Sequence, residues 1–93
     1  MIHSFRDEQT EKIASGQRSR KLPLDIQPKA FVILKLLSAA SGPEDMKSPP
    51  GNRFHALDRD RKGQYSVSIN MQWRICFGWS DGGATDVEIT DYH

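Results

Sequence analysis

Three side chains that can donate or accept a proton, Asp91, Tyr92 and His93, stand next to one another at the end of the sequence. They follow "DVEIT", in which apolar residues alternate with polar ones, as in a strand with one buried face. Chain ends usually fray, so the three residues are either unstructured or held by this strand and used for chemistry. Strict alternation turns Tyr92 away from the core, and Asp91 and His93 join it only if the strand ends near Thr90 and the chain bends.

Two further candidates, His55 and Arg74, are predicted to lie on the same face of a sheet as Tyr92. In "QWRICFGW" the aromatic and aliphatic residues recur at every second position and should face the core, which turns Arg74 and Cys76 the other way. The same alternation in "RFHAL" turns His55 outward. Histidine titrates near neutrality, at about 6.5, and arginine can hold two phosphate oxygens at once. For either residue alone, the simpler interpretation is an exposed side chain, salt-bridged in the case of Arg74.

Two helices are predicted before the strands that carry these residues. "DEQTEKIASG" is typical of a short helix that Asp7 caps and Gly16 ends. "IQPKAFVILKLLSAAS" has apolar residues at a spacing of 3.6, with Pro28 in its first turn and Asp25 or Gln27 as its cap. Its buried stripe is predicted to contain Ala30, Ile33, Leu34 and Leu37, widened by Val32 and Leu36.

After "SPPGN" the apolar period changes from 3.6 to 2, which predicts four strands. These are "RFHAL", "QYSVSIN", "QWRICFGW" and "TDVEIT", joined by the turns "DRDRKG", Asn70-Met71 and "SDGG". The third strand should bury Trp73, Ile75, Phe77 and Trp79. "MIHSF" predicts a short first strand with either Ile2 or the set Met1, His3 and Phe5 facing inward. Two helices followed by an antiparallel meander indicate one α+β domain over residues 1–93.

Composition limits where such a protein would act. A single cysteine allows no intrachain disulfide, which fits a reducing compartment. The longest apolar run, "AFVILKLLSAA", is too short and too charged to span a bilayer, and "MIHSFRDEQTEK" lacks the order of a signal peptide. We therefore expect a cytoplasmic protein without membrane contact and without a metal or cofactor.

The formal net charge of +1 is unevenly distributed. Residues 18–35 contain five cations and one acid, net +4, and residues 47–62 contain five cations and two acids, net +3. The simpler interpretation is two solvated faces, and the alternative is a localised surface for a polyanion.

Three segments in this order, "LDRDRKGQYSVSIN", "QWRICF" and "EITDYH", resemble the HigB-type toxins of the RelE/ParE superfamily. These are the killer proteins of bacterial type II toxin–antitoxin modules, and the resemblance extends over essentially the whole chain. It implies a helical hairpin packed on a twisted antiparallel sheet, and cleavage of mRNA in the A site of the ribosome. It also implies a DNA-binding, HigA-like antitoxin, through which alone the toxin would meet operator DNA.

The resemblance implies catalytic roles for His55, Arg74, Asp91, Tyr92 and His93. This sequence departs from the family pattern at one position. Close relatives often carry "HPLKGDR", whereas this chain has "HALDRDR", so that Asp58 occupies the place of a lysine. Either Arg59 or Arg61 supplies the missing charge, or cleavage is weaker.

RNA cleavage of this kind needs no protein nucleophile, because the 2′-OH of the RNA attacks the adjacent phosphate. The protein must accept the proton of that hydroxyl, stabilise the crowded phosphorane and protonate the leaving 5′-oxygen. We expect His93 or Asp91 as general base and His55 as general acid, Arg74 on the phosphate, and Tyr92 stacking on a base or donating a hydrogen bond. Contacts to ribosomal RNA are expected from Arg18, Arg20, Lys21, Arg53, Arg59, Arg61 and Lys62.

Two alternatives keep the same fold. One is a toxin that poisons a protein target, as the ParE branch does with gyrase, and such a protein needs no catalytic residues. The other is an attenuated relative that chiefly binds its antitoxin, which Asp58 leaves open.

Overall fold

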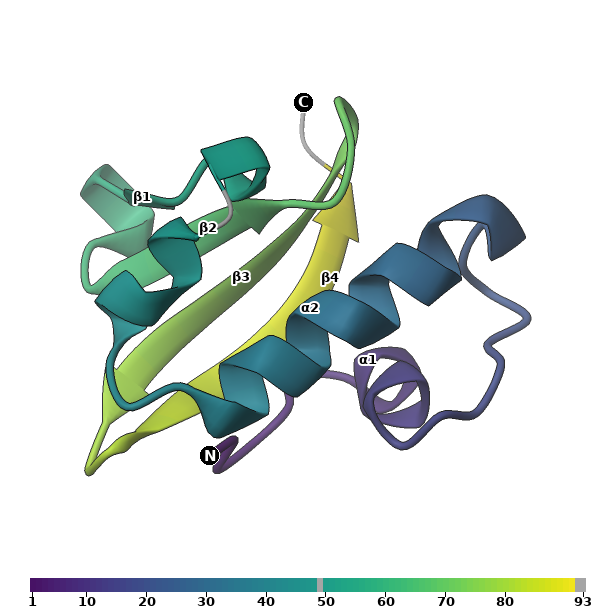
Figure 1. Ribbon diagram of the computed structural model, residues 1–93, viewed down its shortest axis with the longest axis horizontal. Coiled ribbons are helices and arrows are strands. Elements are labelled where there is room, and N and C mark those ends of the chain that lie inside the picture. Colours follow the sequence, from purple (N-terminus) through teal and green to yellow (C-terminus); the bar gives the residue numbers. More distant parts are fainter. Residues whose placement is uncertain (49, 92–93) are drawn as a thin grey trace.

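Four antiparallel strands form one sheet in the order β1-β2-β3-β4, and two helices pack on one of its faces (Figure 1). The computed structural model describes residues 1–48 and 50–91, with the side chains of Pro50 and Arg59 left aside. The helices are α1 (Glu8–Ala14) and α2 (Gln27–Ala39). The strands are β1 (His55–Ala56), β2 (Gln64–Ser68), β3 (Trp73–Ser80) and β4 (Gly83–Asp91). The predicted α+β architecture is confirmed, although the strand predicted in "RFHAL" is only two residues long.

The core lies between the helices and the sheet. Ile75 and Phe77 of β3 are fully buried, and Trp73 and Trp79 at its ends are partly buried against the same cluster. The ring of Tyr65 lies between those of Phe54 and Phe77, at centroid distances of 5.5 and 5.7 Å. Helix α2 contributes Ala30, Ile33, Leu34 and Leu37 to this core, and all four are at most 2% exposed. The alternation in β3 therefore predicted its core face correctly.

The chain start runs beside β4 without forming the predicted strand. Ile2 and Phe5 make isolated parallel bridges to Ala84 and Val87, and both side chains pack against the core. Because these two residues are three positions apart, neither of the two alternating sets expected for "MIHSF" describes the segment. The main chain instead follows a bulge in β4, where Asp86 has a φ of 49° and its N–H donates to Ser4 Oγ at 2.9 Å.

Helix α1 begins and ends as predicted. The Asp7 carboxylate accepts a hydrogen bond from the N–H of Thr10 at 2.7 Å, which satisfies one of the free donors of the first turn. At the other end Gly16 has a φ of 85°, and the N–H of Gln17 donates to the carbonyl of Lys12 in a Schellman arrangement. The Thr10 hydroxyl oxygen also accepts the N–H of Ile89 at 2.9 Å, which ties the helix to β4.

Two expectations for α2 are wrong. The residue before the helix is Ile26, which caps it with no side-chain hydrogen bond, so neither Asp25 nor Gln27 acts as the cap. The buried Gln27 amide instead bonds the main chain of Ser19 and Leu22 and anchors the connector between the helices. Val32 and Leu36 do not widen the buried stripe, because they are 55% and 45% exposed on the side of the helix away from the sheet.

The turns around β3 explain its register. Asp81 and Gly82, with φ values of 52° and 79°, form the tight β3–β4 hairpin predicted from "SDGG". Asn70-Met71 is not the predicted two-residue hairpin, because the loop also includes Ile69 and Gln72. The Asn70 side-chain oxygen closes this loop by accepting the N–H groups of Gln72 and Trp73 at 2.8 and 2.7 Å.

Within the described part of the chain, neither helix is long and apolar enough to cross a membrane.

Candidate functional site

One row of four side chains crosses the sheet on the face away from the helices. His55 pairs with Ser66, Ser66 with Cys76 and Cys76 with Glu88, so these residues share a face and lie side by side across β1, β2, β3 and β4. We call this surface the open face. It also contains Ser68, Arg74 and Thr90, which form the adjacent row. The predicted placement of His55 and Arg74 on one face agrees with this register.

The Arg74 side chain reaches from its own row into the row of His55. Its Nη1 donates to the Oγ of Ser66 at 3.0 Å, and Ser66 is the residue directly paired with His55. The imidazole of His55 is exposed at the edge of the sheet, with Nδ1 3.3 Å from the carbonyl oxygen of Arg53. A titratable ring and a guanidinium therefore flank the fully buried Ser66 hydroxyl.

Asp91 lies at the end of β4 and on the opposite face. It pairs with Trp73, whose ring packs against the core, and its Oδ2 accepts from the Nε2 of Gln72 at 3.0 Å. Asp91 is the last residue of β4 and keeps its place in the ladder opposite Trp73, so strand alternation puts its carboxylate on the other side of the sheet from Arg74. The other predicted site residues of this segment, Tyr92 and His93, lie outside the described residues.

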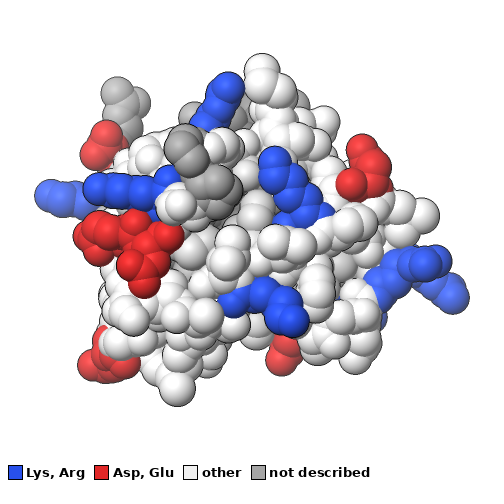
Figure 2. All heavy atoms as spheres, in the orientation of Figure 1, with Lys and Arg blue, Asp and Glu red and all other residues white. Residues whose placement is uncertain are grey.

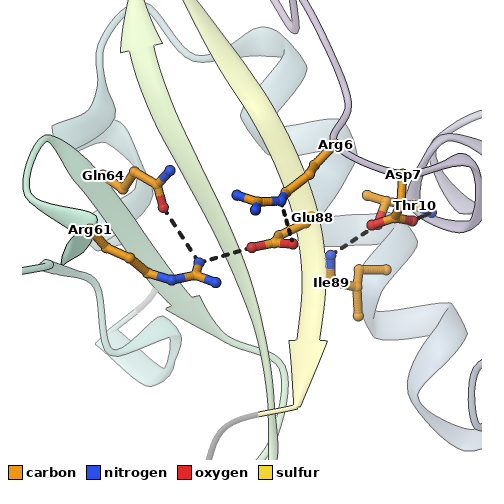
Figure 3. Close-up of polar contacts among 7 residues, drawn as sticks. All are labelled: Arg6, Asp7, Thr10, Arg61, Gln64, Glu88 and Ile89. Atoms are coloured by element: carbon orange, nitrogen blue, oxygen red, sulfur yellow. Dashed lines mark hydrogen bonds and ion pairs between the residues drawn. The ribbon is translucent and has the colours of Figure 1, made fainter.

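Glu88 holds two arginines from distant parts of the chain (Figure 3). Its Oε1 accepts from Nη1 of Arg61 at 2.8 Å, and its Oε2 lies 3.6 Å from Nε of Arg6. The same Nη1 of Arg61 also lies 3.4 Å from Oε1 of Gln64. The hydrogen bond to Glu88 raises the pKa of Arg61 above its ordinary value.

Cys76 lies under these charged groups and is only 5% exposed. Burial raises the pKa of its thiol above the ordinary value of 9.0, while the charge of Arg61 acts in the opposite direction. The thiol is therefore protonated and unreactive near neutral pH, as expected for a small apolar filler.

The predicted RNA-binding cations fall into two separate groups. Arg18, Arg20 and Lys21 are exposed on the connector between α1 and α2, whereas Arg53 and Lys62 are exposed around β1. Figure 1 places the connector and the 57–63 loop at opposite ends of the long axis. On the helix-covered face the Lys and Arg side chains are dispersed, with acidic side chains beside those at the left (Figure 2). The two charge clusters of the sequence therefore do not merge into one continuous surface on that face.

Two hollows lie on the helix side of the molecule. One lies between Phe5, α1 and Leu34, and the other between Ile13, Leu24 and Phe31. Neither is lined by the candidate residues of the open face. Among the described residues there is also no group of three or more His, Cys, Asp or Glu side chains placed to hold a metal ion.

Sequence reasoning missed Glu88, Arg6 and Ser66. Glu88 is an acid in an alternating strand, which is the usual pattern of a solvated residue, yet its side chain is only 14% exposed. The one available signal was its position on the same face as Arg74, because alternation in "DVEIT" turns Glu88 away from Val87 and Ile89.

Solved structures of other bacterial proteins share this architecture. YafQ from Escherichia coli superposes with a TM-score of 0.63 at 16% identity, covering 98% of this chain and 93% of YafQ. A chain of the YoeB–YefM complex from Staphylococcus aureus superposes with a TM-score of 0.62 at 18% identity, covering 100% and 98% of the two chains. Both likenesses show that the fold is shared.

Sequence comparison then defines the family within this fold. The family model for the RelE-like toxin HigB of type II toxin–antitoxin systems matches residues 3–93, and the chain belongs to this family. It is 38% identical to Toxin HigB-1 of Vibrio cholerae over 90 residues, which is 96% of this chain and 95% of that toxin. It is also 37% identical to Endoribonuclease HigB of Proteus vulgaris over 41 residues, covering 44% and 45% of the two chains. Membership of this family implies an antitoxin partner.

Proposed function

We propose that this toxin is a ribosome-dependent endoribonuclease that cleaves mRNA in the ribosomal A site and so stops translation and growth. The observation that carries the proposal is the Arg74–Ser66 hydrogen bond, which holds a guanidinium in the row of His55 on the open face. A phosphodiester lying on this face would meet a guanidinium that can bond two phosphate oxygens and an imidazole that can transfer a proton. Family membership, with one relative named as an endoribonuclease, supports the same activity.

In the proposed reaction the 2′-OH of the RNA attacks the adjacent phosphorus atom and the bond to the 5′-oxygen breaks. Arg74 holds the nonbridging oxygens, on which negative charge develops. His55 protonates the leaving 5′-oxygen, and His93 or Asp91 accepts the proton of the 2′-OH. For Asp91 this role requires its carboxylate to reach around the end of β4 from the helix side. Tyr92, which the alternation of the sequence predicts on the same face as Arg74, is proposed to stack on a base or donate a hydrogen bond.

This chain has a negative charge at the position where close relatives often carry a lysine. Asp58 stands there, and Arg61, one of the two cations proposed to replace the lysine, is held by Glu88. Arg61 therefore contributes to the open face as part of an ion pair. Its bonds to Glu88 and Gln64 both use Nη1.

The proposed partners are the ribosome with its mRNA and a DNA-binding, HigA-like antitoxin that neutralises the toxin in the cytoplasm. Operator DNA is reached only through that antitoxin. Ribosomal RNA is proposed to be contacted by Arg18, Arg20, Lys21, Arg53, Arg59, Arg61 and Lys62. Such contacts give affinity without base specificity and weaken with salt.

The deciding experiment incubates purified toxin with ribosomes carrying a defined message and maps the new 5′ ends. We expect cleavage at the codon in the A site and no cleavage of the same message without ribosomes. His55→Ala should lower the rate by about 10²- to 10⁴-fold, because one proton-transfer group is lost. The matched control is His3→Ala, a histidine beside the β3–β4 turn whose Nε2 contacts the Asp81 carbonyl. A parent protein that arrests growth but leaves the message intact would indicate a toxin that acts on a protein target.

The two separated basic groups can be compared by ribosome binding at several salt concentrations. Neutralising one phosphate contact should lower the slope of log K against log salt by about 0.7–0.9. Arg20→Gln tests the connector and Lys62→Gln tests the loop beside β1. Equal slopes for the parent and both variants would show that neither group faces ribosomal RNA.

A further inference from the structure

The carboxylate of Glu88 is an unexpected group on a surface proposed to receive RNA. A negative charge there repels phosphates and, taken alone, lowers the affinity for RNA. Glu88 is nevertheless well enclosed, with 14% of its side chain exposed, against 41% for Arg61 and 57% for Arg6. Each carboxylate oxygen of Glu88 contacts one arginine, so the charge of this enclosed acid is directed at the two guanidinium groups more than at the solvent (Figure 3).

The Arg61 contact joins the 57–63 loop to the far strand of the sheet. The loop follows β1 directly, and the N–H of Leu57 donates to the carbonyl of Gln64 at 2.9 Å. A 3₁₀ turn then begins at Arg59, with the N–H of Arg61 donating to the carbonyl of Asp58 at 3.2 Å. From this turn the Arg61 side chain reaches across β2 and β3 to Glu88 on β4, because Glu88 pairs with Cys76 of β3 and Cys76 with Ser66 of β2. Arg61 thus lies across the middle of the open face, and Arg74 occupies the adjacent row.

We propose that Glu88 is a positioning residue for RNA: it holds Arg61 over the open face in the orientation in which Arg61 contacts the RNA backbone beside His55 and Arg74. This inference rests on the proposed endoribonuclease activity. Glu88 itself touches no RNA and takes no part in proton transfer. The trio of Glu88, Arg61 and Arg6 keeps a net charge of +1, so the region still attracts phosphate while its geometry is restricted.

The physical reason is the flexibility of a long side chain. A free arginine loses side-chain rotamer entropy when it is immobilised on a ligand. A guanidinium already held by Glu88 and Gln64 has lost most of that freedom during folding, so less is lost when RNA binds. The 57–63 loop, which carries Lys62 and connects to His55 through β1, is held in place by the same bond.

The test is a double-mutant cycle measured with message-programmed ribosomes. Glu88→Gln removes the charge that orients Arg61 while keeping the size of the side chain. We expect KM for programmed ribosomes to rise on the order of tenfold, with a smaller change in kcat. Simple electrostatics predicts the opposite sign, because a negative charge has been removed from an RNA-binding face. Arg61→Gln should raise KM at least as much, and the double variant should be no worse than Arg61→Gln alone, since Glu88 acts through Arg61.

The matched control is Asp86→Asn, which removes one negative charge from the same strand at an exposed position and keeps a residue that tolerates a φ of 49°. Its KM should equal that of the parent. If Glu88→Gln lowers the thermal midpoint, the test uses the variant Arg61→Lys instead. Lysine keeps an ion pair with Glu88 but loses the planar fork of arginine. We then expect the same rise in KM at an unchanged midpoint.

Three results would overturn the inference. These are a Glu88→Gln toxin that cleaves as well as the parent or better, losses that add in the double variant, and an Arg61→Lys toxin with the KM of the parent. Failure of the proposed activity gives a different result, because the parent protein itself would then leave the message intact. In that case the proposed role of Glu88 is rejected as well.

Discussion

The two faces of β3 are both largely buried, but by opposite means. On the helix side Ile75 and Phe77 are fully enclosed by apolar side chains of α2 and neighbouring strands. On the open face Ser66 and Cys76 are also at most 5% exposed, although no helix among the described residues covers them (Figure 1). There the cover consists of charged side chains, since Arg74 bonds Ser66 and the Arg61–Glu88 pair lies near Cys76.

This difference separates stability from function in a small domain. Apolar contacts stabilise the fold from one side and are not directional. Ion pairs and hydrogen bonds on the other side are partly solvated and contribute little stability, but they set the direction of each guanidinium. Substitutions on the helix side should therefore affect unfolding first, and substitutions on the open face should affect the proposed RNA chemistry first.

The largest expected effect is on the helix side. Phe77→Ala should lower the free energy of unfolding by about 3–5 kcal/mol, because a fully buried ring leaves a cavity among packed side chains. Denaturant titration measures it. The neighbouring Cys76→Ala, on the open face, should cost only about 1 kcal/mol. If both variants lost the same free energy of unfolding, the two faces of β3 would contribute equally to stability, contrary to this prediction.

On the open face, Arg74→Lys should lower kcat for message cleavage by roughly 10²-fold, because lysine keeps the charge but cannot hold two phosphate oxygens in a fork. The thermal midpoint should stay close to that of the parent, since Arg74 is not part of the apolar core. Single-turnover cleavage on programmed ribosomes measures the rate. A lysine variant with the full rate would mean that only charge is needed at this position.

The buried thiol offers a smaller effect through pH. Burial raises the pKa of Cys76 above 9.0 in the folded protein, so between the unfolded and folded pKa values the unfolded chain loses this proton more readily. This contribution to stability is complete below the unfolded pKa and is lost as the pH rises through the folded pKa. Above about pH 9, we therefore expect the unfolding free energy of the parent to fall more steeply with pH than that of Cys76→Ala. Parallel curves for the two proteins would contradict the burial of the thiol.

The smallest effect is expected on the outer side of α2. Leu36→Gln should change the free energy of unfolding by no more than about 0.5 kcal/mol, because the side chain is 45% exposed. Its neighbour Leu37 is completely buried, and Leu37→Ala should cost about 2–5 kcal/mol. If the Leu36 variant were the less stable of the two, the orientation of α2 described above would be wrong.

Much of the fold was predictable from short-range patterns. Period 2 in "QWRICFGW" identified the face of Ile75 and Phe77, and the Asp7 cap and Gly16 delimited α1, because each signal depends on neighbours within a few residues. The pattern overestimated the width of the buried stripe of α2. Every residue from Ala30 to Leu37 except Lys35 is apolar, so periodicity cannot distinguish the buried side of the helix from the exposed one. It also failed for "MIHSF", whose partner in the structure is a bulged strand some 80 residues away.

For the site, the sequence by itself determined which side chains share a face, because alternation in a strand places His55 and Arg74 on one side and Asp91 on the other. Only the tertiary structure decided which of these side chains meet. Arg74 reaches the row of His55 through Ser66, and Arg61 meets a carboxylate 27 residues away in sequence. The physical reason is that strand register and loop path bring such partners together. Such long-range pairs therefore depend on the strand order that the core between helices and sheet fixes.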